Sequence, residues 1–188
     1  MGKRTILCLL LGFALSACSG EGDFSPTGNM NIPRHGHTAT KLESGEILIA
    51  AGLTKTSPLG DFEIYDPAQG IFKPYKIQGL RTRGWHKAIL LQDAVLISGG
   101  WTNGGEALRD SFLIETGGRL QSHAMMKYGR YDHTITKLPT GDVLIAGGND
   151  GKRAIRHLEI YAIDKRRFIP AQRPMLMARQ QHLSLIHI

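Results

Sequence analysis

The sequence predicts an all-β protein built from repeated sheets. An arginine followed three residues later by a histidine occurs four times, at intervals of 49, 47 and 49 residues. A period of about 50 residues indicates a repeat architecture, in which each copy forms one structural unit. Nothing in the sequence indicates long amphipathic helices. The four copies are Arg34 and His37, Arg83 and His86, Arg130 and His133, and Arg179 and His182.

A short apolar run follows each of the first three pairs, at residues 47–50, 94–97 and 143–146. These runs are apolar at successive positions and contain β-branched residues, which suits a strand that is buried on both faces. Small residues follow each run, and they mark places where the backbone bends or approaches a neighbour closely. They are Ala51 and Gly52, Gly99 and Gly100, and Gly147 and Gly148.

Large residues keep the same register farther along each repeat. Thirteen positions after the second small residue come Tyr65, Leu113 and Tyr161, and seven positions later come Phe72, Leu120 and Phe168. We expect them to fill the space between the outer parts of adjacent sheets. Four residues before the arginine stand Met30, Met126 and Met175, with Gly79 as the exception.

Two segments carry a family resemblance: the Arg34-x-x-His37-Thr38-Ala39-Thr40 stretch with its counterpart from Arg130, and the 63–67 segment Glu-Ile-Tyr-Asp-Pro. With the glycine pairs, they resemble the bacterial branch of the kelch-repeat family. The resemblance implies a β-propeller of four-stranded blades, with repeats at about 30–78, 79–125 and 126–174 and a partial one at 175–182. Propellers close with about four to eight blades. We therefore expect an incomplete propeller of three blades plus the start of a fourth.

The N-terminus indicates export. Lys3 and Arg4 precede an apolar run at 6–15 that is too short to span a bilayer, which takes about 20 residues. The residues ending at Cys18 resemble a bacterial lipobox, so residues 1–17 are predicted to be a signal peptide and Cys18 to carry the lipid. Residues 18–29 are polar and suit a flexible tether. The alternative is an ordinary signal peptide followed by a chance cysteine.

Composition narrows the function classes. Removing Lys3 and Arg4 from the 23 basic residues leaves 21 against 16 acidic ones, a net charge of +5. The basic residues do not alternate with a stacking platform of aromatics, so nucleic-acid binding is not expected. The eight histidines lack zinc-ligand spacing, and no cofactor or metal is expected. The partners that we expect are a membrane, through the lipid, and a protein or glycan ligand.

The repeated arginines, histidines and glycines have two interpretations. A residue present in every copy usually serves contacts between neighbouring units, here a hydrogen bond or ion pair between blades. The alternative is a ring of functional groups that forms a cationic mouth at one end of the propeller channel. Positions that differ between copies are better ligand candidates. Within the Arg-x-x-His window these are His35, Trp85 and Tyr131, although either aromatic can equally serve packing.

Two functions follow. The first is a non-catalytic binding module for a protein or glycan, anchored by lipid in the bacterial cell envelope. The second is a carbohydrate-active enzyme of the kelch-propeller type, a sugar oxidase or one like a sialic-acid epimerase, with its site completed by further blades. Copper oxidases of this type need a cysteine crosslinked to tyrosine, and the segment after Cys18 has no cysteine. Residues 183–188 break the repeat and resemble a translated sequencing adapter, so we expect a non-native tail; a natural apolar strand is the alternative.

Overall fold

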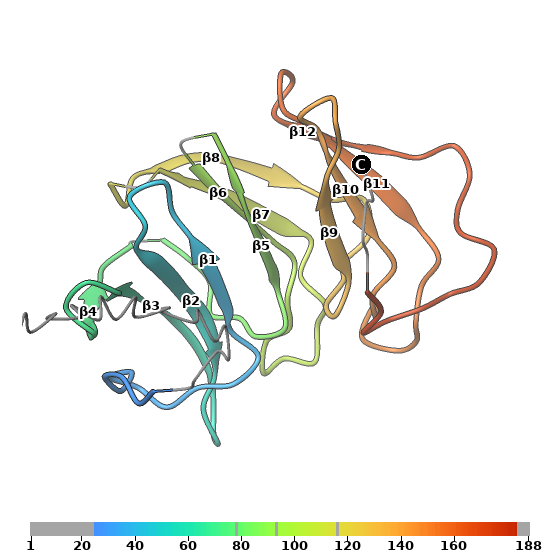
Figure 1. Cartoon of the computed structure of the whole chain (residues 1–188). Coiled ribbons are helices and arrows are strands. Elements are labelled where there is room, and N and C mark those ends of the chain that lie inside the picture. The colour runs from blue at the N-terminus through green and yellow to red at the C-terminus, as the bar shows by residue number, and fades with distance from the viewer. Residues whose placement is uncertain (1–24, 78, 93, 116, 184–188) are drawn as a thin grey trace, which may run out of the picture.

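The computed structural model describes residues 25–183 except 78, 93 and 116. These residues form three four-stranded antiparallel sheets and contain no helix, so the all-β prediction is confirmed (Figure 1). No membrane-spanning helix therefore occurs among them. The predicted signal peptide, Cys18 and residues 184–188 lie outside the described residues.

Each repeat forms one sheet, and the strands follow one another across the sheet in chain order. The first sheet contains β1 (Thr38–Lys41), β2 (Ile47–Leu53), β3 (Pro58–Asp66) and β4 (Ile71–Tyr75). The second contains β5 (Lys87–Leu91), β6 (Ala94–Ser98), β7 (Asp110–Glu115) and β8 (Leu120–Met125). The third contains β9 (Thr134–Lys137), β10 (Val143–Ala146), β11 (Leu158–Ala162) and β12 (Arg167–Pro170).

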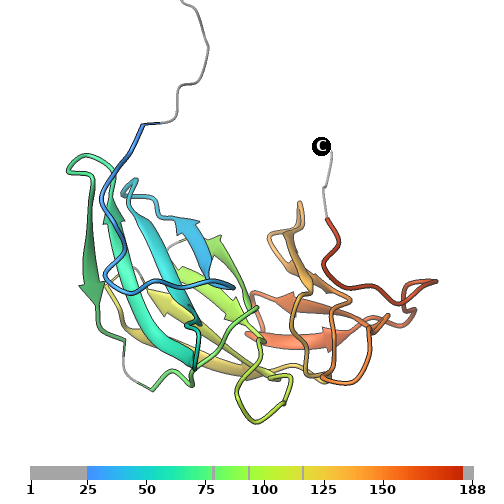
Figure 2. The same cartoon turned by 90° about the horizontal axis from the view of Figure 1, so that it is seen from below.

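The sheets pack face to face in chain order, as Figure 2 shows. Their first strands lie side by side, because β1 contacts β5 and β5 contacts β9. Two apolar cores fill the interfaces between sheets. The core between the first and second sheets contains Leu48, Ala50, Phe62, Ile64, Val95, Ile97, Phe112 and Ile114. The core between the second and third contains Leu91, Leu96, Leu113, Met126, Val143, Ile145 and Tyr161.

The middle sheet explains why the apolar runs are continuous. All five residues of β6 are buried; Val95 and Ile97 belong to the core with the first sheet, whereas Ala94 and Leu96 belong to the core with the third. A strand covered on both faces has no position for a solvated side chain. In β10, by contrast, Leu144 is half-buried, because its face of the third sheet points away from the second.

One predicted correspondence is wrong by one residue. Tyr65 pairs with Ile47, and Tyr161 pairs with Val143, at the start of the buried strand. In the second sheet the residue opposite Val95 is Ile114, not Leu113. The connection after the glycine pair is one residue longer there, which turns Leu113 toward the third sheet and Ile114 toward the first.

The two exceptions in the repeat pattern, Ala51 and Gly79, both occur at the junction between the first and second repeats. A Cβ added to Gly99 would lie 3.3 Å from Met126 Cε, and one added to Gly147 would lie 3.1 Å from Met175 Cε. Each glycine thus leaves space for the methionine that opens the next repeat. Ala51 has the Cβ that the other two copies lack, and the next repeat begins with Gly79 in place of methionine.

Candidate binding site

In the first three windows, the arginine side chain bonds to residues in or directly beside two strands of its own sheet. The side chains of Arg34 and Arg130 are fully buried, and their Nη2 atoms lie 2.6 Å from Glu63 Oε1 and 2.8 Å from Glu159 Oε1. Each Nη1 also donates to the carbonyl of the first small residue after the apolar run, Ala51 in one case and Gly147 in the other. The expected ion pair between neighbouring sheets is therefore wrong for this side chain. The arginine stands beside the place where its own second strand ends and the third begins.

The second repeat reaches the same result with different residues. The position of Glu63 and Glu159 is occupied by Phe112, which pairs with Ile97 as the glutamates pair with their isoleucines. The Arg83 guanidinium carbon lies 5.0 Å from the centre of the Phe112 ring. The carboxylate comes from Asp110, whose two oxygens each accept a hydrogen bond of 3.0 Å from Arg83. A buried guanidinium keeps a charge partner and gains a cation–π contact.

The main chain of the arginine provides the link between sheets. The second small residue of each pair donates its N–H to the arginine carbonyl of the next repeat. The three hydrogen bonds join Gly52 to Arg83, Gly100 to Arg130 and Gly148 to Arg179, each at 2.9 Å. At Gly148 a Cβ would lie 2.7 Å from the Tyr131 carbonyl oxygen, and its φ is +100°, so the position requires glycine.

The histidines also join neighbouring sheets. His86 Nε2 lies 2.9 Å from Thr38 Oγ1, and His182 Nε2 lies 3.1 Å from Thr134 Oγ1. His133 meets Ser98 Oγ instead, at 3.0 Å. In the second repeat the residue after the histidine is lysine rather than threonine. The hydroxyl that the threonine would provide comes there from Ser98 of β6.

Burial keeps the inner histidines neutral. Burial, followed by the charge of Arg83, lowers the pKa of His86 to about 3. Burial and the charge of Arg130 hold the pKa of His133 well below its ordinary value. Neither ring carries a charge near pH 7, so these two histidines add nothing to a cationic channel mouth. Their contacts indicate a role in sheet-to-sheet packing.

The residues between arginine and histidine form a different region. The Trp85 ring lies 6.4 Å from His35, 5.9 Å from Tyr131 and 5.4 Å from Trp101, measured between ring centroids. We call these four side chains the aromatic cluster. His35 is exposed, and the other three are half-buried. The three ligand candidates from the sequence therefore come together across all three sheets.

Trp101, the fourth member of the aromatic cluster, was not predicted from the sequence. Trp101 directly follows the second glycine pair, where the other repeats have Leu53 and Asn149. It carried a usable signal, because it is one of only two tryptophans in the chain and its position differs between copies. Its isolated bridge with Gly84 places it beside the window.

A chain of main-chain hydrogen bonds holds the aromatic cluster. The third residue of each window donates its N–H to the carbonyl of its counterpart in the preceding repeat: Trp85 to Gly36, Asp132 to Trp85 and Gln181 to Asp132. All four residues have φ between +51° and +59°. For a bulky residue such as tryptophan this conformation is strained, and strained residues concentrate at functional sites.

Polar side chains continue the surface beside the aromatic cluster. Gln181 Nε2 donates to Asp132 Oδ2 at 3.1 Å, and Asn149 Nδ2 donates to Gln180 Oε1 at 2.6 Å. Together they place amide and carboxylate groups next to half-buried aromatic rings. Such a surface binds ligands that are apolar on one face and rich in hydroxyls at the edge.

The residues that the structure describes contain no cluster of three or more His, Cys, Asp or Glu arranged to hold a metal ion. No protein-family model matches the sequence, and no curated protein matches it either.

Proposed function

We propose that the protein is an exported, lipid-anchored kelch-repeat propeller protein that binds a glycan without catalysis at the aromatic cluster. The observation that carries the proposal is the position of Trp85. It contacts three other rings while staying half-exposed. It also places a bulky ring at a positive φ that every copy shares and that Gly36 adopts without strain in the first repeat.

The sheet-to-sheet contacts support the propeller. Both interfaces between described sheets have a histidine–hydroxyl contact and a glycine–arginine hydrogen bond. Arg179 and His182 make the same two contacts on the outer face of the third sheet, where no further sheet is described. The segment that would start another blade is thus docked as its predecessors are. Radial repetition of such units is what a propeller requires.

A glycan is the ligand chemistry that best fits the aromatic cluster. A sugar ring presents C–H groups on its face, which stack on aromatic rings, and hydroxyls at its edge, which accept and donate hydrogen bonds. The Asp132 carboxylate already accepts a hydrogen bond from Gln181. Glycoside hydrolysis needs a pair of free carboxylates flanking the bond. Binding is therefore the simpler function for this surface.

The experiment uses the fluorescence of the two tryptophans, because both belong to the aromatic cluster. The full chain in detergent is titrated with cello-, xylo-, galacto- and chitooligosaccharides and their uronic-acid counterparts. We expect a saturable spectral change with at least one series and loss of binding in Trp85→Gly. Phe72→Ala removes a half-buried ring from β4 and serves as the control. If no series binds, or if Trp85→Gly binds normally, the glycan proposal is wrong; saturable binding of a protein alone has the same consequence.

The anchor is tested separately. In cells fed a palmitate analogue, the wild-type protein is expected to be labelled and the Cys18→Ser variant to remain unlabelled. Equal labelling of the two proteins would contradict lipid attachment at Cys18.

A further inference from the structure

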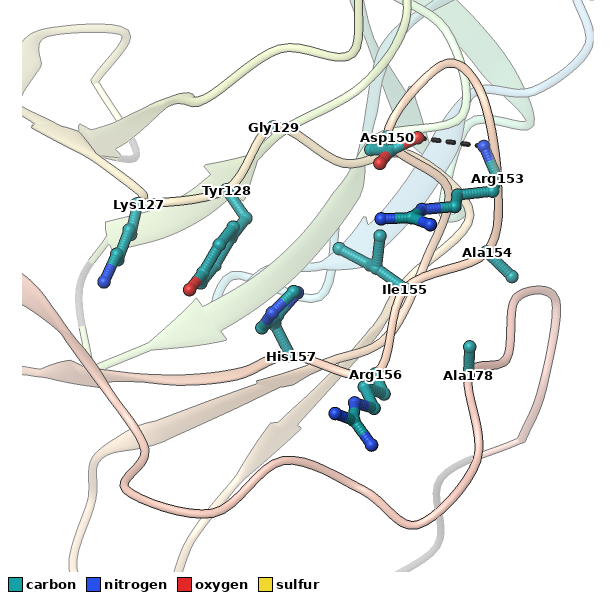
Figure 3. Close-up of a pocket in the computed structure, with 10 residues that line it drawn as sticks. All are labelled: Lys127, Tyr128, Gly129, Asp150, Arg153, Ala154, Ile155, Arg156, His157 and Ala178. Carbon is teal, nitrogen blue, oxygen red and sulfur yellow. Dashed lines mark hydrogen bonds between the residues drawn. The ribbon is translucent and has the colours of Figure 1, made fainter.

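A basic pocket lies among the loops beside the third sheet. It has a volume of about 550 Å³ and is formed by the connection that follows β8, the loop between β10 and β11, and Ala178. Figure 3 shows its lining. The charged and aromatic residues of the lining are Lys127, Tyr128, Asp150, Arg153, Arg156 and His157.

Two stacked rings form one part of the wall. The Tyr128 and His157 rings lie 3.8 Å apart between centroids with an interplanar angle of 12°. Lys127 Nζ lies 5.5 Å from the centre of the Tyr128 ring. In Figure 3, Lys127 lies on one side of the stacked pair, and Arg153 and Arg156 lie on the other. Three cations thus lie around the stacked pair, whose edges and outer faces are left for contact.

The cations of the basic pocket outnumber its acids. Lys127, Arg153 and Arg156 form no ion pair with any carboxylate among the described residues. The one lining carboxylate, Asp150, accepts hydrogen bonds through Oδ1 from the main-chain N–H groups of residues 152 and 153. Burial and then the charges of Arg130 and Arg156 lower the pKa of His157. A lowered histidine pKa agrees with an electropositive environment.

The corresponding pocket of the preceding repeat provides an internal comparison. It has a volume of about 250 Å³. Arg81 stands there at the position of Tyr128, and Glu106 at the position of Arg153. These two residues form an ion pair of 3.3 Å. The excess of cations is therefore particular to the third repeat and does not belong to the framework that the repeats share.

The basic pocket and the aromatic cluster share one loop. Asn149 forms two main-chain hydrogen bonds with Tyr131 of the aromatic cluster, at 3.0 and 2.8 Å. The next residue, Asp150, lines the basic pocket. It also raises the pKa of Tyr131, after the larger effects of burial and Asp132. One extended ligand can reach both places across this loop.

We propose that the basic pocket binds the anionic group of the glycan, so that the ligand is an acidic oligosaccharide carrying carboxylate or sulfate groups. This inference rests on the proposed glycan binding at the aromatic cluster. The planar guanidinium groups of Arg153 and Arg156 suit either oxyanion, because each presents a fork of N–H donors. The sugar bearing the charge lies against the Tyr128 and His157 rings.

The experiment compares charged and neutral forms of the same sugars. Oligogalacturonate is measured against its methyl ester, and a sulfated galactan oligosaccharide against the unsulfated one, by tryptophan fluorescence of the full chain. We expect at least one charged form to bind about tenfold more tightly than its neutral form, with an advantage that shrinks as salt rises. A preference in the first pair identifies carboxylate, and one in the second identifies sulfate.

Variants locate the effect. Arg153→Glu/Arg156→Glu should remove the preference for the charged form and leave binding of the neutral form intact. Lys165→Glu/Arg167→Glu makes the same charge change at the β11–β12 turn and the first residue of β12, and it should keep the preference. Equal affinity for charged and neutral forms, with Trp85→Gly still abolishing binding, would overturn the acidic ligand and leave the glycan function standing. Absence of all binding would overturn both.

Discussion

In the second and third Arg-x-x-His windows, the outer residues differ from the inner ones in both burial and variability. Arg83, His86, Arg130 and His133 are buried, and each makes contacts that recur from repeat to repeat. Between them, Trp85 and Tyr131 stay partly exposed, and the residues at both inner positions differ in every copy. Within four residues, repetition marks the framework and variation marks the surface available to a ligand.

Within the framework, the contacts recur in each repeat, whereas the residues that make them can differ. The second repeat replaces a glutamate by Phe112 and Asp110, and a threonine hydroxyl by that of Ser98, yet its arginine and its histidine-linked interface keep their partners. The physical requirement is a charge partner for a buried guanidinium and a hydroxyl for a buried imidazole. Any nearby residue that meets the requirement suffices.

The largest effect is expected at the buried ion pair. Glu159→Gln leaves the Arg130 guanidinium buried without its carboxylate, which should lower the free energy of unfolding by about 3–5 kcal/mol. Glu106→Gln breaks the exposed pair with Arg81 and should change it by less than about 1 kcal/mol. Urea unfolding of both variants measures the difference. Similar losses of unfolding free energy in the two variants would show that burial does not determine how much each ion pair stabilises the fold.

A smaller effect is expected from pH. In the unfolded chain the imidazole of His86 titrates near its ordinary pKa of 6.5, whereas in the folded chain it stays neutral down to about pH 3. The unfolded state therefore binds more protons in this window, and stability falls as pH falls through it. The slope reaches about 1.4 kcal/mol per pH unit, so about 2 kcal/mol of stability is lost between pH 7 and pH 5. His86→Asn, measured by urea unfolding at pH 7 and pH 5, should show a weaker pH dependence than wild type; an unchanged slope would contradict the neutral histidine.

The smallest effect on stability is expected inside the window. Trp85→Gly relieves a positive φ, which favours the variant by about 1 kcal/mol, and loses ring contacts worth a similar amount. The free energy of unfolding should therefore change by about 1 kcal/mol or less, while glycan binding is lost. Thermal unfolding followed by circular dichroism measures the first quantity. A loss as large as that of Glu159→Gln would assign Trp85 to the framework.

Strand positions were accessible from the sequence because they depend on local pattern. The apolar run at 143–146 became β10, with small residues directly after it, as a buried strand requires. The error at Leu113 arose where the pattern is least constrained: one extra residue in a connection reverses which face a side chain occupies. The three ligand candidates were accessible because they vary against a constant background.

The sequence by itself determined the repeat period, the all-β class and the strand that each apolar run forms, because side-chain pattern and backbone preference act over a few residues. Only the tertiary structure decided that Arg130 meets Glu159 in its own sheet, that Trp101 joins Trp85, and that Lys127 meets Arg153 and Arg156 around a pocket. These groups lie roughly 16 to 29 residues apart in the chain, and chain folding alone brings them within reach.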